Sequence, residues 1–284
     1  KNVTGYDLTK LIVGSEGTLG IITEATLRLI PRPAATLSLM AIFDEMVTAG
    51  RAITNVLTSG ILPAKIEFMD QASIQAVEAY KPMGLPVDAE ALILIELDGN
   101  QQAIREEAEI VKKVMKDSGA REVKKASTKD EEAKMWKARK LVSPAIVRKK
   151  PTKISEDATV PRSKIPAFLK QLQAIKKRYG IDLVVFGHAG DGNLHPNIIC
   201  DKRDAEEMKR VEQAVAAIFK VALEMGGTLS GEHGVGTMKS SFMPMEFNET
   251  TLELMKRMKQ AWDPNGIMNP GKIFPKHGDR LGLR

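Results

Sequence analysis

Hydrophobic positions along the chain follow two spacings, one typical of strands and the other of helices. The segments ATLSLMAIF, KIEFMD and ALILIEL are short, mainly apolar runs, and they predict three strands. Residues 44–59, 70–80 and 101–118 show the spacing of amphipathic helices. The residues expected toward one side of the last helix are Ile104, Ile110, Val111, Val114 and Met115.

The same alternation continues through the second half of the chain. Four helices are predicted over residues 128–148, 163–179, 203–225 and 247–260. TKISEDATVP is predicted to be extended, and IDLVVFGH and LHPNIIC flank the turn AGDGN, which predicts a β-hairpin. The pattern indicates an α+β fold in which helices pack on one face of an antiparallel sheet.

Residues 1–34 form a separate block. LIVGSEGTLGIITEATLRLIP predicts a strand, a tight loop and a second strand, and Pro31 and Pro33 place a boundary near residue 34. The loop GSEGTLG has three glycines at a spacing of three. Its backbone N–H groups can face a phosphate or a flat cofactor, although a simple tight turn has the same spacing. Because the chain begins abruptly and without Met, we expect it to be the later part of a longer protein.

Composition narrows the class of protein. Hydrophobic residues make up 43% and charged residues 27%, as in a globular protein. The net charge is +6, but lysine pairs are scattered among acids and aromatic residues are only 5%, so nucleic-acid binding is not expected. No apolar run approaches the roughly 20 residues of a membrane-spanning helix. The single Cys200 excludes an internal disulfide and indicates a reducing compartment such as the cytoplasm.

Three histidines fall in two glycine-rich segments. His188 and His195 flank the GDGN turn at similar distances, so their imidazoles are expected to converge and to suit a transition metal, or else to be ordinary hydrogen-bonded histidines. Glu232 and His233 lie in GGTLSGEHGVG, where a buried carboxylate needs a partner or a metal. Two histidines and one glutamate leave coordination positions open, and His233 is then available as a proton acceptor. A solvated glycine-rich loop is the alternative. His277, in the polar tail, is assigned no role.

Five motifs in order resemble one known family. They are KNVTGYDLTKLIVGSEGTLGIIT, Trp136-x-x-Arg139, GHAGDGNLHPN, GEHGVG and DPNGIMNPGKIF, and they span nearly the whole chain. The chain resembles the carboxy-terminal part of the FAD-linked oxidases of the vanillyl-alcohol-oxidase type, which include the glycolate oxidase D subunit, D-lactate dehydrogenase and D-2-hydroxyglutarate dehydrogenase. The resemblance implies a ferredoxin-like substrate/cap domain over 35–246. It also implies a remnant of the FAD-binding domain over 1–34, and a helix with a flavin-contacting tail over 247–284.

The resemblance also implies a role for individual residues. The implied ligands of a divalent metal, zinc, are His188, His195 and Glu232. The implied substrate residues are His233 as the base, Arg139 and Ser143 at the carboxylate, and Asn193 nearby. The implied flavin contacts are Gly14, Ser15, Gly17, Thr18, Gly20, Ile21 and Asn269. The register of residues 152–157 decides whether Lys153 matches a second carboxylate-binding lysine of some members.

The implied reaction is FAD-dependent, metal-assisted oxidation of a small D-2-hydroxy acid of the glycolate or D-lactate class to the 2-oxo acid. The implied partners are an electron acceptor, either a protein or a quinone, and a homodimer or a hetero-subunit complex that can associate with a membrane through its other subunits. Two further functions fit the same residues: a non-haem iron oxygenase, which needs no flavin, and a non-catalytic ligand-binding or subunit-docking domain. Metal analysis and replacement of His233 distinguish them.

Overall fold

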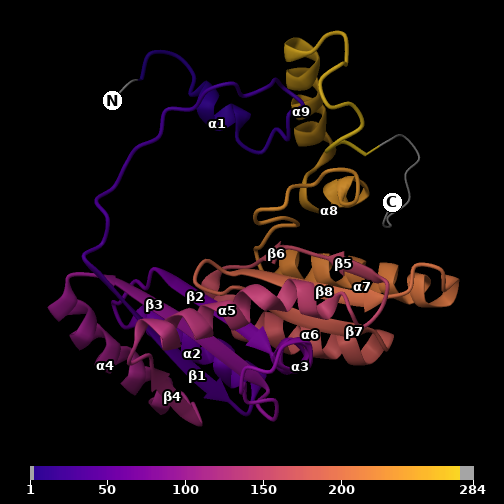
Figure 1. The fold of residues 1–284 in the computed structure, drawn as a ribbon. Helices are drawn as coiled ribbons and strands as arrows, with labels where there is room; N and C mark the ends of the chain where they lie inside the picture. The colour runs from indigo at the N-terminus through magenta and orange to yellow at the C-terminus, as the bar shows by residue number, and fades with distance from the viewer. Residues whose placement is uncertain (1–2, 276–284) are drawn as a thin grey trace. The chain divides into compact units, whose positions relative to one another are not determined.

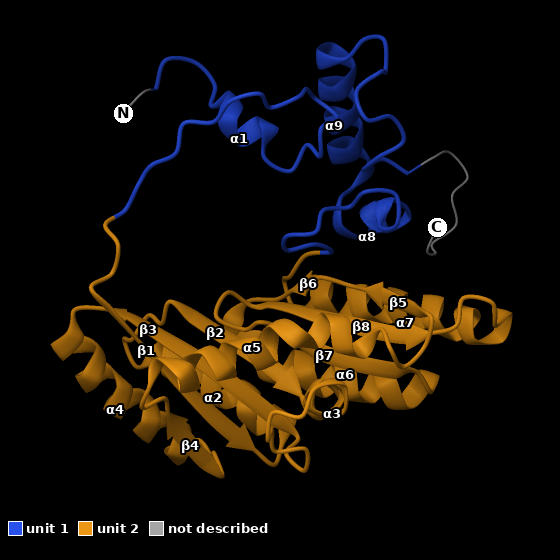
Figure 2. Cartoon of the chain, in the orientation of Figure 1, with its two compact units in different colours: residues 1–30, 229–284 blue, residues 31–228 orange. Residues whose placement is uncertain are grey.

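The computed structural model of the chain describes residues 3–275, and it divides them into two compact units (Figure 2). Unit 2 consists of residues 31–228. Unit 1 combines the described residues before Pro31 with those from Leu229 onward. The change from unit 1 to unit 2 therefore lies a few residues before the predicted boundary at residue 34. His277 lies outside the described residues, as does the end of the predicted tail.

Unit 2 is built on a sheet in which all neighbouring strands are antiparallel (Figure 1). The order is β4-β1-β3-β2-β7-β8-β5, with β6 beside β8. The strands are β1 (Ala35–Phe43), β2 (Lys65–Asp70), β3 (Ala91–Gly99), β4 (Glu122–Lys125), β5 (Thr152–Ser155), β6 (Ala158–Thr159), β7 (Asp182–His188) and β8 (Asn193–Cys200). The three predicted strands and the hairpin are confirmed, whereas β4, a short charged edge strand, was not predicted.

Five helices connect these strands, and a sixth follows β8. They are α2 (Met46–Thr58), α3 (Gln71–Tyr80), α4 (Gln101–Asp117), α5 (Lys129–Ile146), α6 (Ile165–Tyr179) and α7 (Ala205–Glu224), with a 3₁₀ turn η1 (Arg162–Lys164) before α6. Local capping explains several helix starts. The side chains of Asp70, Asn100 and Thr128 accept hydrogen bonds from backbone N–H groups in the first turns of α3, α4 and α5. All six helices agree with the predicted segments within a few residues.

Helices cover both faces of the sheet, so the α+β class is confirmed while the expected placement on one face is corrected. Helices α3 and α5 form one buried cluster with alternate strand residues such as Met69, Leu92 and Phe186. The intervening strand residues, including Phe68 and Ile93, are also buried, which requires a second layer on the opposite face. That layer consists of α2, α4, α6 and α7. Helices α2, α4 and α7 contact strands, and α6 contacts α2 and α7.

Unit 1 is small and has a modest core. Its helices are α1 (Leu8–Ile12), α8 (Met243–Glu246) and α9 (Glu249–Trp262), with a 3₁₀ turn η2 (Ser240–Phe242), and Met243, Leu252 and Ile273 form its buried cluster. The predicted pair of strands within residues 10–30 is wrong. Residues 8–12 are helical, and residues 20–30 pair with no strand of the described chain. Their apolar side chains are largely solvent-exposed, including Ile21 at 80% and Leu29 at 88%.

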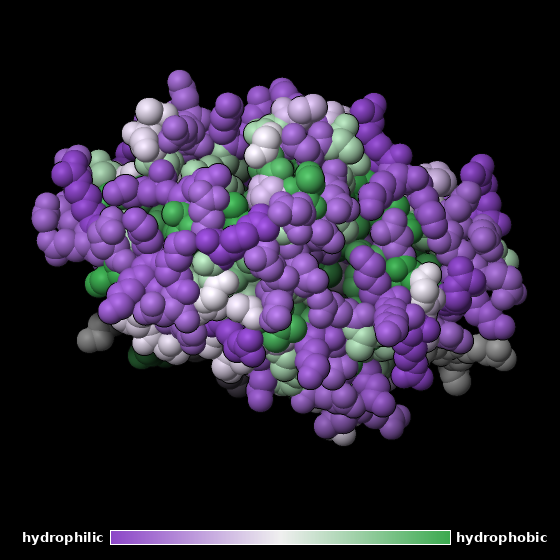
Figure 3. Space-filling model, turned by 90° about the horizontal axis from the view of Figure 1, so that it is seen from below, coloured by the Kyte–Doolittle hydropathy of each residue, from purple (hydrophilic) through white to green (hydrophobic). Residues whose placement is uncertain are grey.

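One face of the molecule shows the polar surface that is typical of a globular protein. The face drawn in Figure 3 is mainly hydrophilic, and hydrophobic residues reach it only as small separate areas. Among the described helices, none combines the length and the apolar character needed to cross a membrane.

Candidate active site

The β7–β8 hairpin brings His188 and His195 together. The turn occupies residues 189–192, and His188 ends β7 while Phe186 pairs with His195 across the two strands. The imidazole centroids of His188 and His195 are 5.2 Å apart with the rings nearly perpendicular. Gly187 permits this hairpin, because a Cβ atom there would lie 2.6 Å from the Asn193 carbonyl oxygen. The expected convergence of the two rings is thus present, while their role as metal ligands stays a prediction.

Glu67 on β2 bridges two of the predicted site residues. Its Oε1 lies 2.6 Å from His188 Nδ1, and its Oε2 accepts a hydrogen bond of 2.7 Å from Arg139 Nε. An ionised carboxylate only accepts hydrogen bonds, so the pairing places the hydrogen of His188 on Nδ1 and leaves Nε2 as the electron-pair donor. Glu67 therefore fixes the imidazole in the form that suits a metal ligand.

Arg139 is held with part of its guanidinium still available. It lies on α5, its Nε binds Glu67, and its guanidinium stacks 4.8 Å from the Phe186 ring. Within the described residues, no other side chain or carbonyl accepts a hydrogen bond from its two Nη groups. Arg139, Glu67 and His188 all line one surface cavity of about 560 Å³ between α5 and the sheet. The two Nη groups can therefore form a fork for a ligand carboxylate.

Trp136, the other motif residue on α5, has a structural role. Its indole Nε1 donates a 2.9 Å hydrogen bond to Ser38 Oγ on β1, which anchors the helix to the sheet one turn before Arg139. The same tryptophan ring lies 4.9 Å from the Lys65 ammonium. The three-residue spacing of the Trp-x-x-Arg motif thus puts Trp136, which anchors the helix, and Arg139, a candidate binding residue, on the same face of α5.

Ser143 lies beside Lys153. The Lys153 Nζ on β5 donates a 3.1 Å hydrogen bond to Ser143 Oγ, one helical turn after Arg139. Burial lowers the pKa of the Lys153 ammonium from its ordinary value. Lys153 therefore lies beside Ser143 on the face of the sheet that α5 covers, while its match to the second carboxylate-binding lysine of some family members stays a prediction.

A row of buried polar residues continues from His195 along β8. Asn193, His195 and Asn197 alternate on one side of the strand and are each at most 5% exposed. Among the described residues, Asn193 Oδ1 and Asn197 Oδ1 have no hydrogen-bond partner, although both are buried. Native proteins rarely leave such atoms unpaired, so these two oxygens are candidate hydrogen-bond acceptors for a water or a polar ligand. Asn193 is the first residue of β8 rather than part of the turn.

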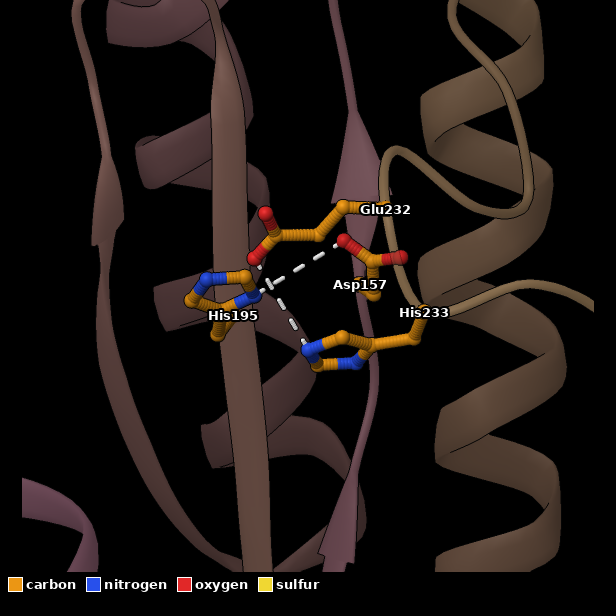
Figure 4. A group of neighbouring side chains, drawn as sticks. All are labelled: Asp157, His195, Glu232 and His233. Atoms are coloured by element: carbon orange, nitrogen blue, oxygen red, sulfur yellow. Dashed lines mark ion pairs between the residues drawn. The ribbon is translucent and has the colours of Figure 1, made fainter. Parts of the chain in front are cut away.

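Asp157 faces His195 within unit 2. Its Oδ1 lies 3.7 Å from His195 Nδ1, and the aspartate is fully buried (Figure 4). As with Glu67 and His188, a carboxylate faces Nδ1 of the imidazole. Both predicted histidine ligands therefore show the arrangement of carboxylate beside histidine that is common at metal centres.

Glu232 and His233 form the corresponding pair in unit 1. Glu232 Oε1 lies 3.8 Å from His233 Nε2, and the side chains are 48% and 43% exposed (Figure 4). Glu232 is therefore partly exposed, and its role as a metal ligand stays a prediction. The cost of burying a charge therefore gives no support for a metal at Glu232. The support that remains is that a carboxylate is a suitable metal ligand.

The glycine-rich loop of unit 1 meets the C-terminal segment at a second candidate site. Ser15, Gly17, Gly20 and Ile21 line a pocket of about 490 Å³ together with residues 267–269. Asn269 lies about 250 positions after this loop and was predicted to contact the flavin. Its Nδ2 donates a 2.5 Å hydrogen bond to the Glu16 carbonyl. Thr18 is buried instead and donates from Oγ1 to the Ser15 carbonyl, while Gly14 does not line the pocket.

Both implied groups fit the residues present. For a divalent metal, unit 2 offers two imidazoles oriented by carboxylates, together with the buried carboxylates of Glu156 and Asp157. For a flavin, unit 1 offers a pocket lined by glycine backbone and by the apolar side chains of Ile21, Ile22, Ile267 and Met268. A flat, mainly apolar ring system suits such walls.

Some of these residues were not found from the sequence. Glu67 and Asp157 carry no motif of their own, and each faces its histidine only because β2 or the segment after β5 lies beside the hairpin. Asn197 had a usable signal, since alternation along the predicted strand LHPNIIC puts it on the same side as His195.

The fold is of the α+β class, and comparison with known proteins shows the family to which the chain belongs. Residues 32–273 match the family described as "FAD linked oxidases, C-terminal domain". The chain belongs to this family.

Two relatives and one solved structure illustrate the likeness. The chain is 45% identical to glycolate oxidase subunit GlcD of Bacillus subtilis over 97% of its length and 59% of that protein. It is 34% identical to the probable mitochondrial D-lactate dehydrogenase of Danio rerio, over 96% and 55% of the two chains. An alkyldihydroxyacetonephosphate synthase structure shares the fold at 20% identity, with a TM-score of 0.67 over 95% and 51%. The chain thus spans a little more than half the length of the relatives it matches.

Proposed function

We propose that this chain provides the substrate-binding and metal-binding side of an FAD-linked oxidation of a small D-2-hydroxy acid, of the glycolate or D-lactate class, to the 2-oxo acid. The observation that carries the proposal is the Glu67 bridge. A single buried carboxylate orients a guanidinium with its Nη fork available and an imidazole with its Nε2 turned away from the bridge. The two features of a 2-hydroxy acid, a carboxylate and an adjacent hydroxyl, require these two kinds of group side by side.

The substrate carboxylate is assigned to Arg139, with Ser143 and Lys153 beside it. The guanidinium fork makes two parallel charge-assisted hydrogen bonds to a carboxylate, which an ammonium group cannot reproduce. Lys153 adds a second positive charge within hydrogen-bond distance of Ser143. The buried amides of Asn193 and Asn197 can accept or donate hydrogen bonds to the substrate hydroxyl and carbonyl oxygens.

The metal ligands we propose are His188, His195 and Glu232, with zinc as the metal. The support is the donor set and the orientation of both histidines by carboxylates, together with the family motif that contains Glu232. His233 is the proposed base, because a neutral imidazole nitrogen can accept the hydroxyl proton.

When bound, the flavin accepts the hydride from the substrate α-carbon and the metal polarises the substrate hydroxyl. The residues of the chain itself hold and orient the substrate. Arg139 fixes the carboxylate end, and His233 takes the proton as the hydroxyl is oxidised. Ser15, Gly17, Gly20, Ile21 and Asn269 provide one wall for the flavin ring. Such positioning accounts for a large part of the rate enhancement in reactions of this kind.

The electrons then pass to an acceptor, which we propose to be a protein or a quinone. The Bacillus subtilis relative is named a subunit of glycolate oxidase. A hetero-subunit complex is therefore favoured over a homodimer for this chain.

Metal and flavin analysis of the 284-residue chain tests the proposal. After dialysis against Zn²⁺ we expect about one tightly bound metal ion per chain and little or no FAD. His188→Ala and His195→Ala should lose the metal, whereas His277→Ala, the control, should keep it. Unfolding temperature should fall on addition of a chelator, since a ligand that binds only the folded state stabilises it.

Two outcomes contradict this assignment. One is a chain that binds no divalent metal or binds it equally well in the two alanine variants. The other is iron as the retained metal with no oxidation of hydroxy acids by a flavin-loaded protein, which would favour an oxygenase.

A further inference from the structure

Glu16 connects two loops that are far apart in the sequence. Its Oε1 accepts a 2.6 Å hydrogen bond from the Val235 N–H, and its Oε2 accepts one of 2.7 Å from the Gly236 N–H. These amides lie two and three residues after His233, about 220 positions along the chain from Glu16. All of these residues belong to unit 1.

The backbone of the same residue secures a third segment. The Glu16 carbonyl accepts the hydrogen bond from Asn269. The Lys259 ammonium on α9 donates hydrogen bonds to the Thr18 carbonyl at 2.6 Å and to the Met268 carbonyl at 2.8 Å. The loop 14–20 is thus joined to residues 231–236 by a side chain and to residues 267–269 by its backbone.

The backbone of Glu16 is strained. Its φ is +51°, in the left-handed region that a residue with a side chain rarely adopts. The opposing residue is glycine, and a Cβ at Gly234 would lie 2.8 Å from Glu16 Oε1. The strained backbone of Glu16 and the φ of +79° at Gly234, which favours glycine, accompany the two hydrogen bonds of one carboxylate.

We propose that Glu16 is a positioning residue that fixes the loop 231–236, and with it His233, against the flavin-lining loop 14–20. This inference rests on the proposed function for the meaning of the two loops: one presents the base and the other faces the flavin. Proton removal and hydride transfer involve two neighbouring atoms of one substrate, so the base and the flavin wall must keep a fixed separation. Glu16 supplies that separation without touching substrate or flavin.

Amide hydrogen exchange of the full chain tests the connection itself, without activity. In Glu16→Gln one side-chain oxygen is replaced by an NH₂ group, which cannot accept. Glu16→Asp keeps the charge but is one methylene too short. We expect exchange at Val235 and Gly236 to quicken about ten-fold or more in both variants, as the loss of a charge-assisted hydrogen bond implies. The amides of α9 should not change, and Glu24→Gln, an exposed acid of the same unit, serves as the control.

The kinetic test separates positioning from simple stabilisation. In a flavin-loaded holoenzyme that contains this chain, Glu16→Gln should lower kcat by up to about 10²-fold, the effect of a displacement near 1 Å. KM should be little changed, because Arg139, the proposed carboxylate-binding residue, belongs to unit 2 and is unaltered. A purely structural role would instead reduce the amount of folded protein and leave kcat per active site unchanged.

The two proposals can fail separately. Unchanged exchange at Val235 and Gly236 in both Glu16 variants overturns the connection, whatever the enzyme does. Faster exchange together with unaltered kcat leaves the contact in place but overturns its role in positioning. A wild-type holoenzyme that oxidises no 2-hydroxy acid refutes the proposed function, while the exchange result still stands.

Discussion

Glu67 is the residue on which the two halves of the proposed substrate site depend. It has no motif of its own, yet it contacts both Arg139 and His188 through opposite carboxylate oxygens. Glu67→Gln keeps the shape but replaces one acceptor oxygen with an NH₂ group. Because such a partner orients a ligating histidine, we predict that zinc affinity of the chain falls about 10–100-fold, as measured by calorimetric titration.

The matched control for this change lies in the same cavity. Glu96 pairs with Lys65 at 2.6 Å and lines the cavity without contacting Arg139 or His188. Glu96→Gln should leave zinc affinity unchanged. Equal losses in Glu67→Gln and Glu96→Gln would show that cavity charge, rather than orientation of His188, controls the metal.

Arg139 allows a second residue-level prediction. Arg139→Lys retains the positive charge but loses both the Nε contact to Glu67 and the planar fork. We expect KM for a small 2-hydroxy acid to rise about ten-fold or more, the equivalent of one charge-assisted hydrogen bond, with a smaller effect on kcat. Steady-state kinetics of the holoenzyme measure this. Lys137→Arg, at an exposed position on the same helix, should change neither constant.

Residues with a local signal could be predicted from the sequence, whereas their partners could not. The hairpin prediction located His188 and His195, and the motif located Arg139. Glu67 is separated from Arg139 by 72 positions and from His188 by 121, so only the strand order places it between them. Helical spacing also misjudged Ile110, which was expected with Val111 and Met115 but is 48% exposed.

At the scale of elements, Asp70 joins the start of α3 to β7. One carboxylate oxygen accepts from Ser73 N–H and Oγ, and the other accepts from the Val185 N–H at 2.8 Å. Burial raises the pKa of Asp70, and these hydrogen bonds oppose that effect. Asp70→Asn turns an NH₂ group toward Val185 N–H. We predict that the free energy of unfolding falls by about 1–3 kcal/mol, as for other buried groups that lose a partner.

Denaturant unfolding of the full chain measures this change. Asp98→Asn, at an exposed position on β3, is the control and should stay within about 0.5 kcal/mol of the wild type. A loss of similar size in both variants would show that overall charge, not the buried contact to Val185, is responsible.

Helices and strands with a strong hydrophobic pattern could be predicted from the sequence. Segments that have no neighbouring strand in the described structure were predicted wrongly. Helices α2 to α7 and the β7–β8 hairpin follow their hydrophobic patterns. Residues 20–30 have β-branched composition but no neighbouring strand in the described chain, and a strand is stable only when its backbone groups are paired. The coverage of both sheet faces also escaped prediction, because α3 and α5 have no sequence feature that selects a face.

At the scale of the whole molecule, membership of the FAD-linked oxidase family rests on a match over residues 32–273. The chain spans 59% of its Bacillus subtilis relative, so the catalysed reaction is a proposal about a holoenzyme in which this chain takes part. The family supports an FAD-linked oxidation, and the roles of Arg139, the two histidines and the glycine-lined pocket in it are part of our proposal.

Anaerobic mixing of the flavin-loaded holoenzyme with glycolate or D-lactate tests this chemistry most directly. The flavin absorbance should bleach as the hydroxy acid is oxidised, and His233→Ala should slow the bleaching by about 10²–10⁴-fold, the usual contribution of a general base. Bleaching at the wild-type rate in His233→Ala, or no bleaching with any small 2-hydroxy acid, would contradict the account.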